Sequence, residues 1–155
     1  VCESEKMEHL EQLQRAKAEF LNARQRLEGE KVEAKERAVD KLIEQLLPMY
    51  DSFTMAMANQ DTWEAVDESW RKGVEAIYSQ LKSILQSYQV QEVNPNGEQF
   101  DPEHHEAMGY EPVEDAAQHD TVVKVLQIGF KRKEAAGDRH IRPARVIVGN
   151  FTQDN

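Results

Sequence analysis

The sequence has little cysteine, few aromatic residues and no long apolar run. Its one cysteine, Cys2, has no partner within the chain, which excludes an intramolecular disulfide framework and favours a reducing compartment. Aromatic residues make up 7% of the 155 residues and charged residues 31%, which argues against a single large core. No apolar run approaches the roughly 20 residues that span a bilayer. We therefore expect a polar chain with an elongated or oligomeric arrangement and no membrane segment.

The compartment follows from the same features. A cytoplasmic location fits the free thiol and the polar composition. Because the sequence begins at Val1 rather than Met, a transit peptide before Val1 would instead indicate an organelle matrix.

Signatures of catalysis are also missing. The sequence has no GxxxxGK[ST] or GxGxxG loop that would hold a phosphate. The cluster Asp101–Glu106 (DPEHHE) offers oxygen and imidazole ligands, but it lacks an HExxH pattern or a cysteine pair. The adjacent His104 and His105 tend to point apart, so a histidine that holds a turn is expected rather than a metal ligand. A small hydrolase built on this cluster would lack a nucleophile, and we predict no enzyme, no cofactor and no metal.

Charge is distributed unevenly along this acidic chain, whose formal net charge is -10. Residues 90–121 hold nine acidic and no basic side chains, whereas residues 122–155 hold seven basic and three acidic ones. The overall acidity disfavours nucleic acid as a partner, because phosphate binding rewards a basic surface. The basic C-terminal stretch therefore needs a local explanation.

A long helix is predicted for the first third of the chain. Between Glu3 and Leu47 there is no proline and one glycine, Gly29, and strong helix formers dominate. A helix of this length needs a partner outside its own chain. Its apolar stripe is interrupted, so the helix is either a solvated helix with a narrow dimer contact or one whose basic residues bind a partner. The stripe contains Leu10, Leu13, Phe20 and Leu27, and the interruptions are Lys17, Arg24 and Lys31.

A second helix completes a predicted hairpin. Pro48 is expected to kink or restart the first helix, and Asp61–Glu64 (DTWE) resembles a capping box that opens the second one. Gly73 lies on the apolar face of the second helix and suggests a close helix approach. Two such hairpins would form a four-helix bundle in a dimer. The expected packing residues are Leu46, Leu47, Trp70, Gly73, Val74, Ile77 and Leu81.

A small β-module is predicted after the helices. Helical periodicity ends near Gln89, and strands are predicted at Val122–Phe130 and Arg139–Val148 with a turn around Ala136. Pro143 has no N–H and places the last strand at a sheet edge or at an irregularity in the ladder. The predicted class is α+β, with regions 1–47, 48–89 and 90–155.

Five stretches in this order resemble the GrpE family of nucleotide exchange factors for DnaK-type chaperones. They cover about residues 10 to 149, and Met55 departs from the basic residue that the family usually shows near this position, while Gly109-Tyr110 replaces its usual short apolar run. The stretches are Arg15–Arg26 (RAKAEFLNARQR), Leu46–Phe53 (LLPMYDSF), Gly73–Ile77 (GVEAI), Phe100–Ala107 (FDPEHHEA) and Ile141–Ala144 (IRPA) with Val146 and Val148.

The resemblance implies a parallel homodimer with a helical stalk, a four-helix bundle and two β-wings that contact the chaperone's nucleotide-binding domain. It implies that the arginines of the last strand face this partner, that the protein is a co-chaperone in protein folding and stress response, and that Arg142 and Pro143 are structural or accessory. A coiled-coil scaffold with a generic β binding module is the alternative. The chaperone contacts that the resemblance implies are Arg24, Met55, Leu126, Arg139 and Val148.

The first testable prediction is that the chain is an elongated dimer in sedimentation experiments. Gly73→Asp should place an unpaired charge at the helix contact, cost several kcal/mol and weaken the dimer. A compact monomer at micromolar concentration would contradict the architecture, and unchanged melting of the Gly73→Asp variant would contradict the helix contact.

Overall fold

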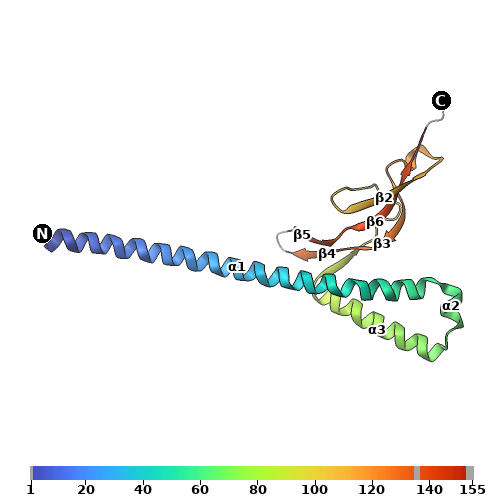
Figure 1. Cartoon of the computed structure of the whole chain (residues 1–155), viewed down its shortest axis with the longest axis horizontal. Coiled ribbons are helices and arrows are strands. Elements are labelled where there is room, and N and C mark those ends of the chain that lie inside the picture. The colour runs from blue at the N-terminus through green and yellow to red at the C-terminus, as the bar shows by residue number, and fades with distance from the viewer. Residues whose placement is uncertain (1, 135–136, 153–155) are drawn as a thin grey trace. The chain divides into compact units, whose positions relative to one another are not determined.

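The computed structural model describes residues 2–134 and 137–152. Helices come first along the chain and β-strands follow, which confirms the predicted α+β class (Figure 1). The chain divides into two compact units, Val1–Leu42 and Ile43–Asn155. Within the described ranges, no helix combines the length and the apolar character needed to cross a membrane.

Helix α1 (Cys2–Ala58) provides the whole described part of the first unit. The apolar side chains of the predicted stripe are exposed there, Leu10 by 52%, Phe20 by 66% and Leu27 by 59%. Helix propensity accounts for the helix itself, since the segment consists of strong helix formers. The first unit as described leaves the stripe uncovered.

The same helix continues through Pro48, so of the two predicted effects of this proline, a kink or a restart of the helix, the restart is wrong. Proline in a helix interior removes one backbone hydrogen bond and costs about 3 kcal/mol. The neighbouring side chains Ile43, Leu47 and Tyr50 are at most 3% exposed. Burial of about 1.5 to 3 kcal/mol for each large apolar side chain offsets the cost of the proline.

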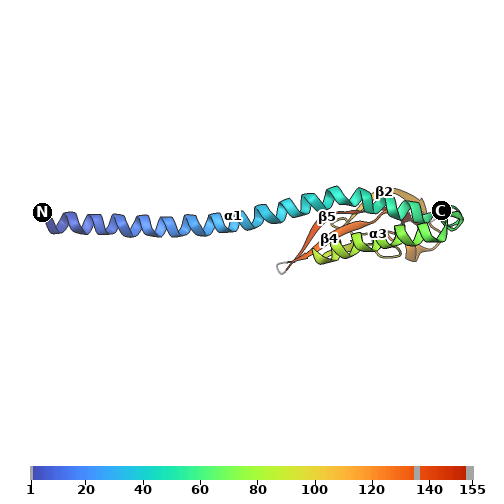
Figure 2. The same cartoon turned by 90° about the horizontal axis from the view of Figure 1, so that it is seen from below.

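Helices α2 (Gln60–Ala65) and α3 (Glu68–Ser87) correct the prediction of one helix from Asp61 onward. The side chain of Asn59 caps α2 by accepting from the Thr62 N–H at 3.2 Å, and Asp67 caps α3 by accepting from the Trp70 N–H at 3.2 Å. Helix α2 ends at Val66, whose backbone is extended, and Asp67, with the non-helical ψ of 133° of a cap residue, starts α3. Figures 1 and 2 show α3 beside the last part of α1, as the predicted hairpin requires.

Six strands form two three-stranded sheets in the second unit as described. The β4 sheet has the order β1-β4-β5 and is antiparallel. The β6 sheet has the order β2-β6-β3, with β2 parallel and β3 antiparallel to β6. The strands are β1 (Val90–Val93), β2 (His105–Pro112), β3 (Val122–Gln127), β4 (Gly129–Glu134), β5 (Gly137–Arg142) and β6 (Ala144–Asn150), and a 3₁₀ turn covers Ala116–Gln118.

The chain passes from one sheet to the other at Ile128 and returns at Pro143. Each of the two predicted strands is therefore two strands in different sheets. Pro143 marks an irregularity rather than an edge, because β6 is the central strand of its sheet. A Cβ at Gly129 would lie 2.5 Å from the Ala144 nitrogen, so only glycine fits where the two crossings meet. The predicted turn around Ala136 lies partly outside the described residues.

The β6 sheet encloses the core of the β part. Ala144, Val146 and Val148 alternate along β6 and are fully buried, together with Val122 of β3. The partly buried residues that pack on them are Val93, Phe100, Ala107 and Val125.

Arg142 fastens the β part to helix α1. Its Nη1 donates to Asp51 Oδ2 at 2.7 Å and its Nη2 donates to Asp51 Oδ1 at 2.9 Å. The guanidinium also donates to the Ile128 carbonyl, at 2.6 Å from Nη2, and lies 5.2 Å from the centre of the Phe130 ring. Gln127 Nε2 adds a bond to Asp51 Oδ2 at 2.9 Å. These contacts give Arg142 the structural role expected from the sequence.

Tyr50, next to Asp51, makes the apolar part of this connection. Its ring meets Phe130 of β4 edge-on at 5.0 Å and lies 5.4 Å from the ring of Tyr78 in α3. Its hydroxyl donates to Glu92 Oε1 at 2.6 Å. Burial, together with the nearby Glu92 carboxylate, raises the pKa of Tyr50, so the hydroxyl keeps its proton and remains a donor.

We predict that the Asp51–Arg142 pair contributes measurably to the free energy of unfolding. The Arg142 and Asp51 side chains are 19% and 23% exposed, so Arg142→Ala should cost about 1.5 to 3 kcal/mol, as expected for charge-assisted hydrogen bonds. In a double-mutant cycle with Asp51→Ala, followed by urea unfolding, the coupling should be about 1 to 3 kcal/mol.

The matched control for this prediction is the surface pair Arg145–Glu106. Its side chains are 51% and 48% exposed, and its coupling should be about 1 kcal/mol or less. Equal coupling in the two cycles would show that Asp51–Arg142 is an ordinary surface pair.

Candidate partner-binding surface

A groove lies between the end of α1 and strand β3, and we call it the α1–β3 groove. Its volume is about 510 Å³, and its lining includes Tyr50, Asp51, Thr54 and Met55 on one side and Val123 to Ile128 on the other. Met55 is 75% exposed and Leu126 is 51% exposed. Two of the side chains predicted to contact a chaperone, distant in sequence, thus line the same groove.

The groove combines an apolar surface with one exposed cation. Lys124 is exposed on β3, whereas the Asp51 carboxylate at the groove is bound by Arg142. An apolar side chain with a nearby carboxylate is the chemistry that fits such a lining. Sequence reasoning did not single out Lys124 or Asp51, although Asp51 lies within the recognised stretch Leu46–Phe53. Its pairing with Arg142 depends on the fold.

Arg139 lies on β5, outside the lining of this groove. Its Nε is 3.1 Å from Glu134 Oε1, with the Arg139 side chain 33% exposed. Glu134 also binds Arg132 Nη2 at 3.0 Å. Arg142 and Arg145 are paired as well, with Asp51 and Glu106. The expectation that the arginines of the predicted strand Arg139–Val148 face another protein is incomplete, because all three, on β5 and β6, have an acidic partner in their own chain.

Val148 does not fit the role of a contact residue. It is 0% exposed and belongs to the core of the β6 sheet. Alternation along β6 turns its side chain inward, so it supports the strand and is not available to a partner. The predicted direct contact at Val148 is therefore wrong.

Arg24 is exposed on α1 in the first unit.

The predicted packing residues divide into two groups. Leu47 and Leu81 are buried within the chain at 1% and 7% exposure, and Leu46 and Val74 are half-buried. Trp70 and Ile77 are 61% and 55% exposed. Ile84, which was not among the predicted packing residues, is 45% exposed, and the spacing of seven residues puts all three on one side of α3. A Cβ at Gly73 would meet nothing within 4 Å, so the expected close helix approach is not made within the described chain.

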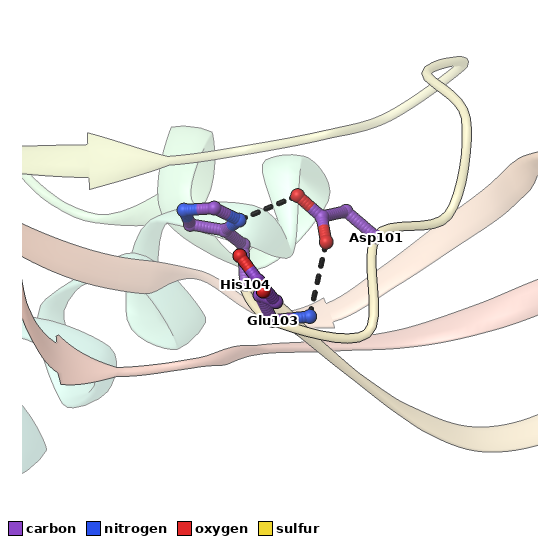
Figure 3. A group of neighbouring side chains, drawn as sticks. All are labelled: Asp101, Glu103 and His104. Carbon is purple, nitrogen blue, oxygen red and sulfur yellow. Dashed lines mark hydrogen bonds and ion pairs between the residues drawn. The ribbon is translucent and has the colours of Figure 1, made fainter.

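The histidine cluster forms the turn that precedes β2, as Figure 3 shows. The His104 ring contacts Asp101 Oδ2 at 2.5 Å, and the Glu103 N–H donates to Asp101 Oδ1 at 3.0 Å. The Glu103 N–H and the His104 ring hold the pKa of Asp101 below its ordinary value. The expectation that a histidine holds the turn is confirmed.

His105 has a different environment from His104. It is 8% exposed, and its Nδ1 accepts from the Asp101 N–H at 3.0 Å. Burial lowers the pKa of His105, which favours the neutral ring that this hydrogen bond requires. Both adjacent histidines therefore bond to Asp101, His104 to its carboxylate and His105 to its backbone N–H.

Comparison with known proteins agrees with the recognised stretches. A family model described as GrpE matches residues 2–150. The protein named Protein GrpE from Caldanaerobacter subterraneus subsp. tengcongensis is 38% identical over 94% of this chain and 67% of its own length. Proteins of the same name from Halorhodospira halophila and Legionella pneumophila are 34% and 38% identical over 95% and 96% of this chain, which spans 59% and 71% of their lengths. With a match over nearly its whole length, this chain belongs to the GrpE family.

Proposed function

We propose that the protein is a co-chaperone that binds the nucleotide-binding domain of a DnaK-type chaperone and accelerates ADP release. The observation that carries the proposal is the α1–β3 groove, which the exposed side chains of Met55 and Leu126 both line. Membership of the GrpE family supports the same activity. The protein acts by binding, without covalent chemistry of its own.

The proposed mechanism is a linkage between two binding equilibria. A protein that binds the open nucleotide-binding domain more tightly than the closed one lowers the affinity for ADP by the same factor. Such a protein needs a rigid binding surface. A surface that adapted to both forms of the domain would lose the difference in affinity between the open and the closed one. The contacts of Asp51 and Tyr50 with the β part supply this rigidity on both sides of the groove.

The exposed side of α3 supports a homodimer. Trp70, Ile77 and Ile84 form an apolar stripe that the described chain leaves exposed, while Leu81 and Leu85 pack internally. A second copy that presents the same stripe would bury it in a four-helix bundle. Gly73 would lie within that contact and allow the helices to approach closely.

We predict that Met55→Ala and Leu126→Ala each slow chaperone ADP release stimulated by the protein. Truncating a contact worth about 1 to 3 kcal/mol weakens binding roughly 5- to 150-fold. Stopped-flow release of a fluorescent ADP analogue from a DnaK-type chaperone measures the effect over a concentration series. Because the two side chains line one groove, their effects should not be additive.

Met108→Ala provides the control for the groove variants. Met108 is 51% exposed, as is Leu126, but it does not line the α1–β3 groove. The Met108→Ala variant should stimulate ADP release from the chaperone as much as the wild-type protein does. A scaffold without exchange activity would leave ADP release unstimulated, and equal rates for the groove variants and Met108→Ala would exclude the groove as the contact.

A separate prediction concerns Arg139, which has to exchange its bond with Glu134 for a bond with the partner. Arg139→Ala should weaken partner binding roughly 10- to 150-fold, since charge-assisted contacts contribute about 1.5 to 3 kcal/mol. Glu134→Ala removes the competing carboxylate and should bind the partner at least as tightly as wild type. Titration of the chaperone by calorimetry measures both.

Arg145→Ala is the comparison, because Arg145 also has a surface partner, Glu106. It should bind like wild type. If Glu134→Ala weakens binding as much as Arg139→Ala, the pair acts on the fold of the β part and Arg139 does not contact the chaperone.

A further inference from the structure

Strand β2 forms one edge of the β6 sheet, because the strand order of this sheet is β2-β6-β3. On its inner side β2 is paired in register with β6 from His105 to Pro112. Within the described ranges, the backbone of Glu106–Pro112 bonds to no element other than β6. An edge strand of this kind directs a row of N–H and C=O groups outward, and another extended chain can pair with them.

The middle of β2 presents apolar side chains to the solvent. Met108 is 51% exposed and Tyr110 is 67% exposed, and neither belongs to the core of the β6 sheet. The register between β2 and β6 shifts at Met108, which is the extra residue of a β-bulge, and bulges often redirect a side chain next to a binding site. Gly109 lies between the two side chains and allows another backbone to approach closely. Exposed methionine and tyrosine side chains are typical of protein interfaces.

Acidic side chains flank this apolar middle on both sides. Glu103 and Glu106 precede it, and Glu111 and Glu114 follow it, all of them exposed. Glu106 is paired with Arg145 of β6 at 3.1 Å. Among the described residues, no cation forms an ion pair with the other three carboxylates, so the edge as a whole is acidic and favours a basic partner.

The same charges disfavour a second copy of this chain as the partner. Two β2 edges side by side would bring identical carboxylates together, and like charges on paired strands are destabilising. Many edge strands avoid pairing by means of lysine or proline. Strand β2 contains no lysine, and Pro112 blocks only its last position. An extended chain with basic side chains meets neither obstacle.

We propose that β2 binds an extended segment of another protein by strand addition, and that this segment has an apolar centre and basic ends. Met108 and Tyr110 contact the apolar centre, while Glu103, Glu111 and Glu114 attract the basic ends. Main-chain hydrogen bonds supply affinity in such a complex, and the side chains supply the preference for one sequence. Because β2 and β3 are opposite edges of the β6 sheet, the proposal does not depend on the α1–β3 groove or on the exchange activity.

Fluorescence anisotropy with the intact chain tests the proposal. The probe is a labelled peptide of about seven residues, which matches β2 at roughly 3.3 Å per residue, with valine and leucine at its centre and lysine at both ends. We expect saturable binding of this peptide. The same peptide with glutamate at both ends should bind roughly tenfold more weakly, because its end charges repel the edge. A peptide with prolines at its centre should also bind roughly tenfold more weakly, since proline has no N–H to donate.

Two variants locate the binding at β2. Tyr110→Lys and Glu111→Lys should each weaken binding of the lysine-ended peptide roughly fivefold, because a lysine on the edge repels it. Both residues are exposed, so the melting temperature should not change. Glu64→Lys is the matched control, because it makes the same change of charge at an exposed residue of α2. It should bind the peptide like the wild-type protein.

A further measurement uses only the wild-type chain. The lysine-ended peptide should slow amide hydrogen exchange at alternate residues of β2, whose N–H groups become donors, and leave exchange on β3 unchanged. Absence of binding by this peptide, or equal binding of the peptide with glutamate ends, would overturn the proposal. Exchange at β2 that slows as the protein concentration rises without peptide would also overturn it, and would identify a second copy as the partner.

Discussion

The two-pronged contact between Asp51 and Arg142 is the interaction on which the arrangement of the second unit depends. It joins a helix residue to the last residue of β5, immediately before the chain returns to the other sheet at Pro143. The same guanidinium binds the Ile128 carbonyl at the other crossing point. One side chain therefore holds helix α1 and both crossings, and the nearby Tyr50 and Phe130 rings shield it in part from water. Fixed donors in such surroundings lose little entropy on pairing.

This contact also explains how a fold with two small sheets can present a binding surface. The α1–β3 groove has Asp51 on its helix side, and Gln127, which binds Asp51, on its strand side. Movement of the β part relative to α1 would break these bonds before it changed the groove. The exposed Met55 and Leu126 are thus held by residues that contribute to stability, while they themselves contribute little to it. The proposed binding and the folding of the chain therefore depend on neighbouring but different side chains.

The arginines near the end of this acidic chain mainly form ion pairs with carboxylates of the same chain. Arg142 and Arg145 bind carboxylates that are distant in sequence, and Arg139 binds one on the neighbouring strand. An excess of acidic residues elsewhere in the chain supplies the partners, so the charge asymmetry along the sequence is in part a pattern of internal pairing. Lys124 differs from these arginines, since it is exposed at the groove.

The sequence by itself determined the long helix, the helical hairpin, the α+β class and the family, because helix propensity, apolar spacing and the recognised stretches are properties of neighbouring residues. The family resemblance also implied that Arg142 is structural or accessory. Only the tertiary structure decided that β3 and β4 are separate strands, that Val148 is buried, and that Met55 and Leu126 share a groove. These facts depend on long-range strand register. A crossing between sheets, as at Ile128 or Pro143, leaves no periodic pattern in the sequence, and the face that a strand residue occupies is set by the sheet that the strand joins. Pro48 shows the same limit. Local helix propensity predicts that the helix breaks at this proline, but the burial of Leu47 and Tyr50 against the rest of the unit stabilises a helix that continues through it.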